Sequence, residues 1–456
     1  MDKLVQHVSG QNQAALDELF EFLKIPSVSA DEAFLPHMTK CANWVEAAMQ
    51  KAGLTTEMVQ TAGHPIVYGE RIVNADLPTV LVYGHYDVQP PDPLDLWTTA
   101  PFEPQVRDGK LFARGATDDK GQLFTHLKSI QAWIDSEGEL PVNIKFLVEG
   151  EEEVGSENLN HFLESRKDAL AADIAVISDT SQYGDGIPAI TYGLRGIVAC
   201  EVRLTGPSKD LHSGVYGGSI SNPANALAKI CGSLIADNGK VQIPGFYDDV
   251  QELSEMEQQQ FAALPFDESN FLDSIGSNAV FGEEGYSTLE RRWARPTCDI
   301  NGMLSGYTGQ GPKTIVPSTS MAKITCRLVP GQDPVKILKS LQAFLADQCP
   351  AGIQFDFAAD HGCVAFALDP TSPWMTAASN AIEAAFGKSP VFIREGGSIP
   401  VVTSFQQILG IDTLLLGWGR NSDNLHSPDE HIHVVDFENG ILASTWLWKK
   451  LSEVNA

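Results

Sequence analysis

The chain has 456 residues, of which 43% are hydrophobic and 20% are charged, a composition typical of globular proteins rather than of disordered or fibrous ones. Its 31 basic and 59 acidic residues give a formal net charge of -28, which opposes binding to phosphate backbones and to anionic lipid surfaces. We therefore expect no nucleic acid and no membrane as a partner, and the length predicts about two to three domains.

Seven cysteines are scattered along the chain without a CxxC pair, and this odd number favours free thiols in a reducing compartment over a disulfide framework. The N-terminal segment MDKLVQHVSGQNQAALDELF lacks the apolar core of a signal peptide. No later apolar run approaches the ~18 residues that a membrane span requires. We therefore expect a cytoplasmic protein.

The first part of the chain predicts helices that cover a sheet. Apolar residues recur at helical spacing up to Leu23 and again from Met38 to Met49. Short apolar runs typical of buried strands follow at 79–83, 142–148, 173–177 and 413–416, with helical patterns between the first three. This alternation predicts an α/β fold with a mixed, largely parallel sheet that is sandwiched by helices.

A different pattern begins near Tyr192. Residues 198–204 alternate between apolar and polar side chains, as expected for a half-exposed strand, and further strands are predicted at 321–328 and 353–357. Helices are predicted between them, and a long polar insertion spans about 242–311. This region therefore indicates an α+β, ferredoxin-like lid/dimerisation domain.

The pattern of the first part returns at Ser372-Pro373, an N-cap followed by proline at the first helical position. The helix that begins there ends near Gly387 and precedes the strand at 413–416. We therefore expect a discontinuous catalytic domain, made of residues 1–191 and 372–456, which the lid/dimerisation domain at 192–371 interrupts.

Each apolar run of the expected catalytic domain is followed by candidate metal ligands. In open α/β sheets, ligands bind beyond the carboxyl ends of the strands. The residues that follow the four runs are His85 and Asp87, the acidic run from Glu149 to Glu153, Asp179, and, after a Gly-Trp-Gly turn, His426. A single histidine is more often structural and an acidic run is more often a solvated surface, but four such strand ends predict one site.

A fifth candidate lies in the turn ARGATDDKG at 113–121, just before a helix with an apolar stripe from Leu123 to Ile134. Acidic residues at such a turn are often only helix-start residues, yet Asp118 could bridge two cations. Imidazole and carboxylate ligands without thiolate suit Zn²⁺, Mn²⁺ or Co²⁺, and a site with open positions is typical of catalysis.

Five motifs together resemble one family of metallopeptidases, that of aminoacylase, carboxypeptidase G and carnosine dipeptidase. They are GHYDVQP (84–90), RGATDDKG (114–121), EGEEEVGS (149–156), the SD pair (178–179) and LHSPDE (425–430). Four more motifs are similar to those of the cytosolic nonspecific, carnosine-type dipeptidases: DLHSGVYGG (210–218), KTIVP (313–317), CRLVPG (326–331) and REGGSIP (394–400).

The resemblance implies two divalent metal ions per subunit, Zn²⁺ or Mn²⁺, and assigns a ligand to each motif. His85 and Asp179 would bind one ion, Glu153 and His426 the other, and Asp118 would bridge both. Asp87 would accept the second N–H of the His85 imidazole and fix its tautomer. A cis peptide bond would join Asp118 to the next residue.

The resemblance also implies that Glu152 is the general base that takes a proton from metal-activated water. In the family pattern EGxEExGS, the second of two adjacent acids binds metal. Here a third glutamate, Glu151, leaves a slip of one residue open. Glu149 and Glu151 are expected to take no part in catalysis.

The resemblance implies substrate contacts from the lid/dimerisation domain and from a turn in the second part of the catalytic domain. His212 would donate to the developing oxyanion, and in dimeric relatives the equivalent histidine reaches the site of the neighbouring subunit, which implies a homodimer. Arg327, Thr314 and the turn with Gly397 and Ser398 would hold a substrate carboxylate. Arg327 could equally be an ordinary surface arginine, and His212 a histidine of a surface loop.

We therefore expect metal-dependent hydrolysis of dipeptides or short peptides with a free C-terminal carboxylate. The same two-metal site could instead serve an N-acyl-amino-acid hydrolase or a carboxypeptidase. A non-catalytic metal or peptide sensor is disfavoured, because all five ligands and Glu152 are present. A two-metal phosphoesterase would share the metal chemistry, but the sequence has no evident phosphate-binding loop.

Overall fold

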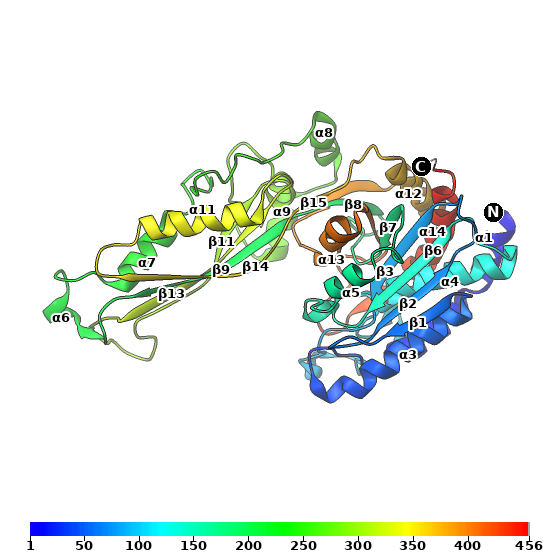
Figure 1. The fold of residues 1–456 in the computed structure, drawn as a ribbon, viewed down its shortest axis with the longest axis horizontal. Coiled ribbons are helices and arrows are strands. Elements are labelled where there is room, and N and C mark those ends of the chain that lie inside the picture. Colours follow the sequence, from blue (N-terminus) through cyan, green and yellow to red (C-terminus); the bar gives the residue numbers. More distant parts are fainter. Residues whose placement is uncertain (455–456) are drawn as a thin grey trace. The chain divides into compact units, whose positions relative to one another are not determined.

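The protein, described here by a computed structural model for residues 1–454, divides into two compact units (Figure 1). Unit 1 comprises Met1–Tyr192, Leu368–Ile393 and Pro400–Ala456, and unit 2 comprises Gly193–Ala367 and Arg394–Ile399. The short segment Arg394–Ile399 thus joins unit 2, whereas the domain bounds expected from the sequence put it in the catalytic domain.

Unit 1 is built on a sheet with a parallel centre. Its strands lie in the order β1 (Thr55–Val59), β2 (Ile66–Arg71), β6 (Asn143–Glu149), β3 (Thr79–His85), β7 (Ile174–Ile177), β17 (Thr413–Gly417) and β8 (Ala189–Leu194), and β16 (Val391–Glu395) pairs with β8. β6, β3, β7 and β17 pair in parallel, while β1, β2 and β8 add antiparallel edges. The mixed, largely parallel α/β fold predicted from the sequence is confirmed.

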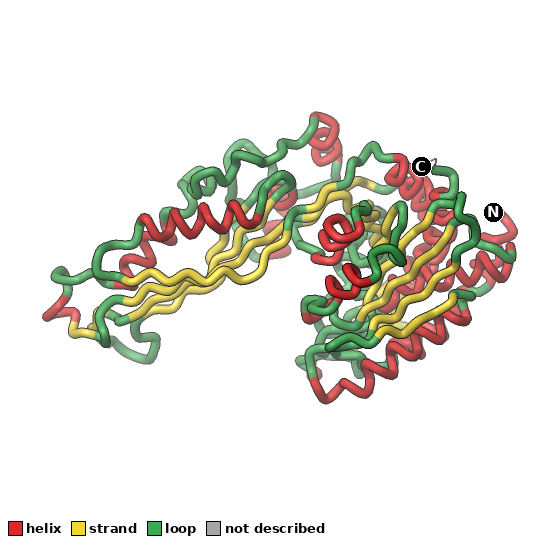
Figure 2. The backbone as a smooth tube through the Cα atoms, viewed as in Figure 1, coloured by secondary structure: helices red, strands yellow, loops and turns green. Residues whose placement is uncertain are grey.

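Helices lie on either side of these strands (Figure 2). They are α1 (Asp2–Gly10), α2 (Asn12–Leu23), α3 (Leu35–Lys51), α4 (Lys120–Glu137), α5 (Leu159–Ser165), α12 (Pro373–Phe386), α13 (Pro400–Ser404) and α14 (Val434–Leu451). α4 packs against β3 and α14, and α12 packs against α14. Burial of β3 and β6 is complete or nearly so, as expected for parallel strands that helices cover on both faces.

A small sheet and short helical turns complete unit 1. The sheet joins β18 (His431–His433), β5 (Lys110–Phe112) and β4 (Gln105–Arg107). The turns are η1 (Glu32–Phe34), η2 (Leu94–Leu96), η3 (Glu152–Val154) and the π-helical η4 (Phe405–Leu409). Among residues 1–454, none of the helices is long and apolar enough to cross a membrane.

Unit 2 contains an antiparallel four-stranded sheet in the order β11 (Thr297–Ser305), β13 (Thr319–Leu328), β9 (Gly196–Thr205) and β14 (Gln354–Cys363). In chain order, β9, α7 (Pro223–Gly232), β11, β13, α11 (Pro334–Asp347) and β14 give the ferredoxin-like succession β-α-β-β-α-β. The predicted α+β character is therefore confirmed, and β11 is a strand that lies inside the predicted polar insertion.

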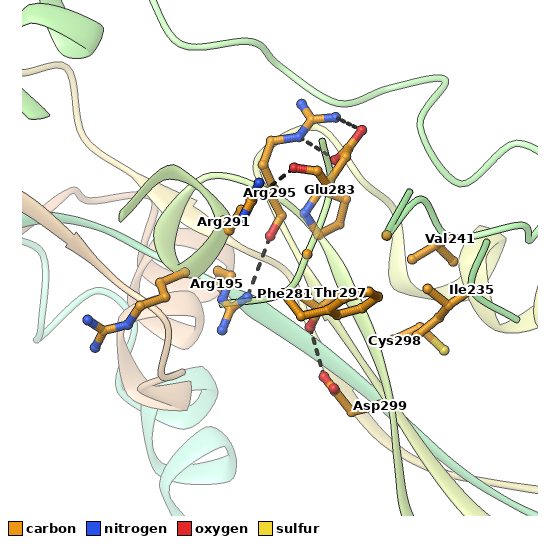
Figure 3. A pocket seen from close by; sticks show the side chains of 14 residues that line it. Arg195, Ile235, Val241, Phe281, Glu283, Arg291, Arg295, Thr297, Cys298 and Asp299 are labelled. Carbon is orange, nitrogen blue, oxygen red and sulfur yellow. Dashed lines mark hydrogen bonds and ion pairs between the residues drawn. The ribbon is translucent and has the colours of Figure 1, made fainter. Parts of the chain in front are cut away.

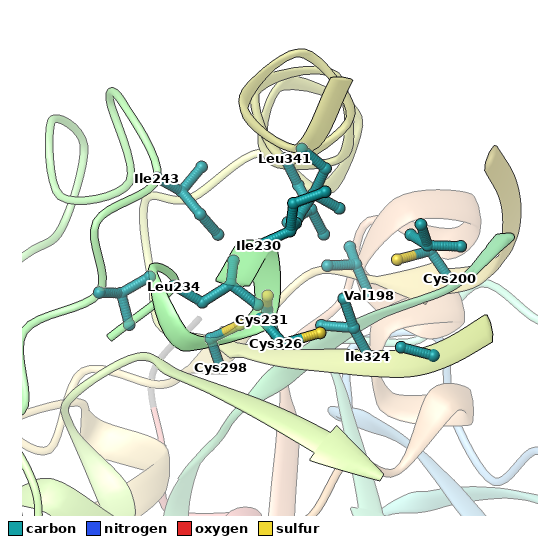
Figure 4. Packing of buried hydrophobic residues seen from close by; sticks show 14 of the residues in the cluster. Val198, Cys200, Ile230, Cys231, Leu234, Ile243, Cys298, Ile324, Cys326 and Leu341 are labelled. Carbon is teal, nitrogen blue, oxygen red and sulfur yellow. The ribbon is translucent and has the colours of Figure 1, made fainter. Parts of the chain in front are cut away.

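The core of unit 2 lies between this sheet and its two helices (Figure 4). Val198 and Cys200 of β9 and Ile324 of β13 meet Ile230 of α7 and Leu341 of α11. The remaining elements are β10 (Leu211–His212), α6 (Ser213–Tyr216), α8 (Glu255–Ala263), α9 (Glu268–Ile275), α10 (Thr288–Trp293), β12 (Ile315–Val316) and β15 (Phe366–Ala367). β10 pairs with β12 in a separate two-stranded ribbon.

Candidate metal centre

The parallel strands of unit 1 bring three of the predicted ligand segments to one edge of the sheet. β3 ends at His85, which is in register with Glu149 at the end of β6. β6 leads into η3, which carries Glu152 and Glu153, and β7 leads into Asp179. Because the strands run in the same direction, their carboxyl ends lie side by side.

One group of potential ligand atoms consists of His85, Asp118 and Asp179, whose donor atoms all lie within 4.8 Å of one another. His85 Nε2 lies 3.2 Å from Asp118 Oδ1 and 3.9 Å from Asp179 Oδ2. The His85 side chain is fully buried, and that of Asp179 is 16% exposed. These three residues come from β3, from the turn before α4 and from the loop after β7.

A second group consists of Asp118, Glu153 and His426, again with donor atoms within 4.8 Å. His426 Nε2 lies 2.8 Å from Asp118 Oδ2 and 3.5 Å from Glu153 Oε2. Asp118 therefore directs one carboxylate oxygen toward each histidine. The two groups share this residue, and the shared carboxylate gives the arrangement needed to bridge two cations.

Asp87 contacts one residue of each donor group, His85 of the first and Glu153 of the second. Its Oδ1 lies 3.3 Å from His85 Nδ1, and its Oδ2 accepts a hydrogen bond of 3.1 Å from the Glu153 backbone N–H. The Asp87 carbonyl oxygen also lies 3.1 Å from the same His85 nitrogen. Two acceptors at Nδ1 leave Nε2 directed toward Asp118 and Asp179, an orientation that suits a metal-binding imidazole.

The turn that carries Asp118 is held by Glu430, a residue that was not among the predicted site residues. The Glu430 carboxylate is fully buried, pairs with Arg114 at 2.7 Å and accepts hydrogen bonds from the backbone N–H groups of Thr117 and Asp118 at 3.0 and 3.1 Å. The peptide bond between Asp118 and Asp119 is cis. Glu430 lies within the LHSPDE motif, four residues after His426. The motif therefore predicted that this segment is part of the site, but it did not predict that Glu430 holds the Asp118 turn.

The three consecutive glutamates after β6 have different surroundings. Glu151 faces away from the ligands, because its carboxylate accepts hydrogen bonds from the His64 backbone N–H at 2.7 Å and from the Asn158 side chain. Glu153 is the one that lies beside His426. Glu152 is half-buried between them, and its pKa is raised to about 8 by burial and by neighbouring acids, which outweigh the opposite effect of His85.

The charges at this edge fit a pair of divalent cations. Burial and adjacent carboxylates raise the pKa of Glu153 to about 8 and that of Asp179 to about 6, because several negative charges face one another there. His85 Nε2 is buried and makes no well-directed hydrogen bond among the described residues. Bound cations would neutralise the repulsion between the carboxylates and would give His85 Nε2 a partner. A donor set of nitrogen and oxygen without sulfur suits Zn²⁺ or Mn²⁺.

The predicted substrate residues of unit 2 form two separate groups. His212 of β10 pairs with Ile315 of β12, and Thr314 directly precedes β12. The Thr314 carbonyl oxygen accepts a hydrogen bond of 3.0 Å from the Ser213 backbone N–H. His212 is exposed, and its Nδ1 accepts the Gly214 N–H at 3.0 Å, so Nε2 carries the proton. Arg327 at the end of β13 instead donates to Ser398 Oγ at 3.1 Å, beside Gly397.

A further arginine, Arg195, holds the turn that contains Gly396 and Ser398. It donates to the Gly396 carbonyl oxygen at 3.2 Å, and its own carbonyl oxygen accepts from Ser398 Oγ. Burial, together with the nearby charge of Arg327, lowers the pKa of Arg195 to about 10. Arg195 lies in the segment LRG (194–196). No pattern in this segment distinguishes it from an arginine on the protein surface.

Arg195 also borders a cavity of about 260 Å³ inside unit 2 (Figure 3). Ile235, Val241 and Phe281 form an apolar side of this cavity, and Arg295 lies across from them. Glu283 pairs with Arg295 at 2.8 Å and neutralises it. The cavity is therefore partly apolar, and its lining holds four arginines against two acidic residues, Glu283 and Asp299.

Comparisons with known proteins identify the family of the chain. Residues 81–449 match the model of the family described as peptidase family M20/M25/M40. The Cys-Gly metallodipeptidase dug1 of Schizosaccharomyces pombe is 33% identical over 97% of this chain and 96% of its own length. The human Beta-Ala-His dipeptidase is 33% identical over 82% of this chain and 75% of its own length.

A solved structure is similar over almost the entire chain. The M20 family metallo-carboxypeptidase Sso-CP2 from Sulfolobus solfataricus has 34% identity and a TM-score of 0.85, and the match covers 96% of this chain and 99% of that one. The family match spans most of the sequence and contains every predicted metal ligand. The chain belongs to peptidase family M20/M25/M40 and is a dinuclear metallopeptidase.

Proposed function

We propose that the protein hydrolyses dipeptides at a two-metal site formed by His85, Asp118, Glu153, Asp179 and His426. The observation that carries this proposal is the pair of three-residue donor groups that share the Asp118 carboxylate. The relatives named as Cys-Gly and Beta-Ala-His dipeptidases support a dipeptide as the substrate. The nitrogen and oxygen donors support Zn²⁺ or Mn²⁺ as the resident ions.

When bound, two such ions polarise the scissile carbonyl and lower the pKa of water at the site. Glu152 accepts the proton of the attacking water and delivers it to the departing amine. The position of Glu152 supports this role, because it lies on η3 directly beside the ligand Glu153 and belongs to neither donor group itself. Asp87 holds the His85 ring in place, and the hydrogen bonds of Glu430 hold the turn with Asp118.

The free carboxylate of the substrate binds Arg327, with Ser398 and the exposed Gly397 beside it. Arg327 is half-buried, and a guanidinium can donate two parallel hydrogen bonds to a carboxylate. Gly396 allows the close approach of this turn, because a Cβ there would lie 2.7 Å from Arg195 and 2.9 Å from a backbone oxygen. Thr314 contributes from the other group of unit 2.

His212 and Thr314 act on the site of a second copy of the chain. Thr319 and Arg327 stand at the two ends of β13 and are eight residues apart, which is about 26 Å at ~3.3 Å per residue. β12, the partner of the His212 strand, ends just before Thr319. One dipeptide is too short to contact both groups in one chain, which supports a homodimer with His212 supplied in trans.

Mixed dimers test this exchange. His212→Ala and Glu152→Ala homodimers are each expected to lose nearly all activity, whereas a heterodimer contains one site in which Glu152 and the partner-supplied histidine are both intact. Such heterodimers should recover about half of the wild-type turnover per dimer, measured after tandem-tag purification. Heterodimers that form and remain inactive would argue that His212 acts within its own chain.

A free amino terminus distinguishes the proposed dipeptidase from its alternative. The similarity to a metallo-carboxypeptidase favours an N-acyl-amino-acid hydrolase or carboxypeptidase as the second candidate on the same site. We expect a panel of dipeptides to be cleaved at least ~10-fold faster, in kcat/KM, than their N-acetyl forms, because loss of one charged contact costs at least about 1.4 kcal/mol. Faster cleavage of the acetylated forms would identify the alternative.

The proposed location is the cytoplasm. All seven cysteines are unpaired, and five of them are buried. Burial raises the pKa of Cys41, Cys200 and Cys231, so these thiols stay protonated at neutral pH. A set of free thiols supports a reducing compartment.

A further inference from the structure

A third group of potential ligands lies next to the two groups that share Asp118. Asp423, His431 and His433 have donor atoms that all lie within 4.8 Å of one another. His431 Nε2 is 3.5 Å and His433 Nε2 is 3.9 Å from Asp423 Oδ1. The two histidines are alternate residues of β18, so their side chains project from the same face of that strand. The proposed reaction uses none of the three.

The Asp423 carboxylate is buried, and one of its two oxygens lacks a hydrogen-bond partner among the described residues. Its side chain is 0% exposed, and its Oδ2 accepts from the Arg420 backbone N–H at 2.8 Å and from Thr117 Oγ1 at 3.2 Å. Its Oδ1 has no hydrogen-bond partner among the described residues and is the atom that faces both imidazoles. A buried carboxylate oxygen without a partner is costly and indicates a missing cation or donor.

The histidine tautomers decide between these two possibilities. His431 Nδ1 lies 2.9 Å from the Asp429 carbonyl oxygen, which can only accept, so Nδ1 carries the proton. The lone pair of His431 Nε2 therefore points toward Asp423 Oδ1. Burial lowers the pKa of both His431 and His433, and Lys110 and Arg420 lower it further, so both imidazoles are neutral at neutral pH. His433 Nε2, at 3.9 Å, is too far from Asp423 Oδ1 to donate a hydrogen bond to it.

Two positive side chains face this group. The Lys110 ammonium lies 3.1 Å from His431 Nε2, and this half-exposed side chain has a flexible stem on which it can turn toward solvent. Arg420 is engaged elsewhere, because its Nε donates to Asp436 and its Nη1 lies 3.6 Å from Asp185. Other acidic groups near the histidines are Asp429 and Asp436. Lys110 is thus the one charge that an incoming cation must displace.

We propose that Asp423, His431 and His433 bind a third divalent transition-metal ion. Two imidazoles and one carboxylate suit Zn²⁺, whose ligand bonds of ~2.0–2.1 Å place tetrahedral ligand atoms about 3.3–3.5 Å apart. The His431 separation of 3.5 Å falls at the end of this range, and the His433 separation of 3.9 Å is about 0.4 Å longer. The Nδ1 hydrogen bond of His431 supplies the usual outer support of a metal-binding imidazole, and the 18% exposure of His433 gives a path of entry.

This ion would act as a clamp on the neighbouring metal centre. Asp423 lies three residues before His426, and its Oδ2 binds Thr117, the residue before Asp118. Thr117 Oγ1 also lies 2.7 Å from the His431 carbonyl oxygen, so its one hydroxyl proton is shared between this oxygen and Asp423. An ion bound to Asp423 and β18 would therefore tie the loop of His426 to the turn of Asp118. The site itself stands on its own ligands and does not depend on the proposed substrate.

Metal counting tests the proposal. The full-length protein and its variants are dialysed against buffered free Zn²⁺ over a range of concentrations, and bound zinc per chain is measured by mass spectrometry. His433→Gln is expected to bind one ion fewer than wild type, whereas the control His161→Gln, at an exposed position on α5, binds as many as wild type. Equal zinc content in His433→Gln and wild type at every free Zn²⁺ concentration overturns the site.

A second variant changes the affinity in the opposite direction. Lys110→Met removes the competing ammonium, so the third ion should bind at least ~10-fold more tightly, while a Lys110→Met/His433→Gln double variant gains nothing. Lys110→Met also tests the third site if His433→Gln does not fold. An unchanged Zn²⁺ affinity in Lys110→Met then overturns the proposal. The difference of one ion is read independently of peptidase activity, so it separates this site from the proposed two-metal reaction.

Discussion

Glu152→Gln is expected to lower kcat by about 10³-fold while both metal ions remain bound, because general acid–base catalysis contributes ~10²–10⁴-fold and an amide cannot accept the proton of water. Glu152 belongs to neither donor group, so its loss leaves the ligands intact. KM should change little, since the variant keeps all groups proposed to bind the substrate. Steady-state kinetics and metal analysis on the same preparation give both results.

The two neighbouring glutamates provide matched comparisons. Glu153→Gln should lose one ion, since Glu153 is the residue beside His426. Glu151→Gln should keep both ions and most of the turnover but unfold at a lower temperature, because Glu151 binds the His64 backbone and Asn158. Glu157→Gln, at an exposed position in the same loop, is the neutral control. Wild-type turnover in Glu152→Gln would refute its assignment as the base.

The ligand segments could be predicted from the sequence because each candidate ligand comes shortly after an apolar run that predicts a strand. In a parallel sheet, the strand ends must lie along one edge, so an apolar run followed by His85 and another followed by Asp179 already place both residues at that edge. Distances within the site could not be predicted in this way. They depend on Glu430, which fixes the Asp118 turn from a segment more than 300 residues later, at a separation that no local pattern encodes.

Other features had no signal in the sequence. β11 was not predicted, because in Thr297–Ser305 only Cys298 is buried and the register shifts between Ile300 and Gly302, so the apolar alternation of a strand is missing. Arg195 was missed because its role depends on the Gly396 turn, which comes from a distant part of the chain. The ferredoxin-like order, by contrast, could be predicted from the regular patterns of β9, β13 and the two helices.

Asp118→Asn is expected to lower activity about as much as Glu152→Gln does, but through a different cause, the loss of bound metal. Asp118 is the only one of the five predicted ligands that belongs to both donor groups, and its two oxygens face His85 and His426. Burial would raise its pKa, but the two histidines hold that pKa below its ordinary value, so the residue is an anion at neutral pH. An asparagine supplies one neutral oxygen in place of two charged ones and cannot bridge two cations equally well.

We therefore expect purified Asp118→Asn to retain less than one of the two ions after dialysis and to lose activity by ~10³-fold or more, since a metal contributes several kcal/mol of transition-state stabilisation. Asp108→Asn is the control, because it makes the same change at an exposed turn. Excess Zn²⁺ or Mn²⁺ should restore activity only in part. If Asp118→Asn binds two ions as tightly as the wild type, the bridge is wrongly assigned, and the two donor groups would then have to hold their cations independently.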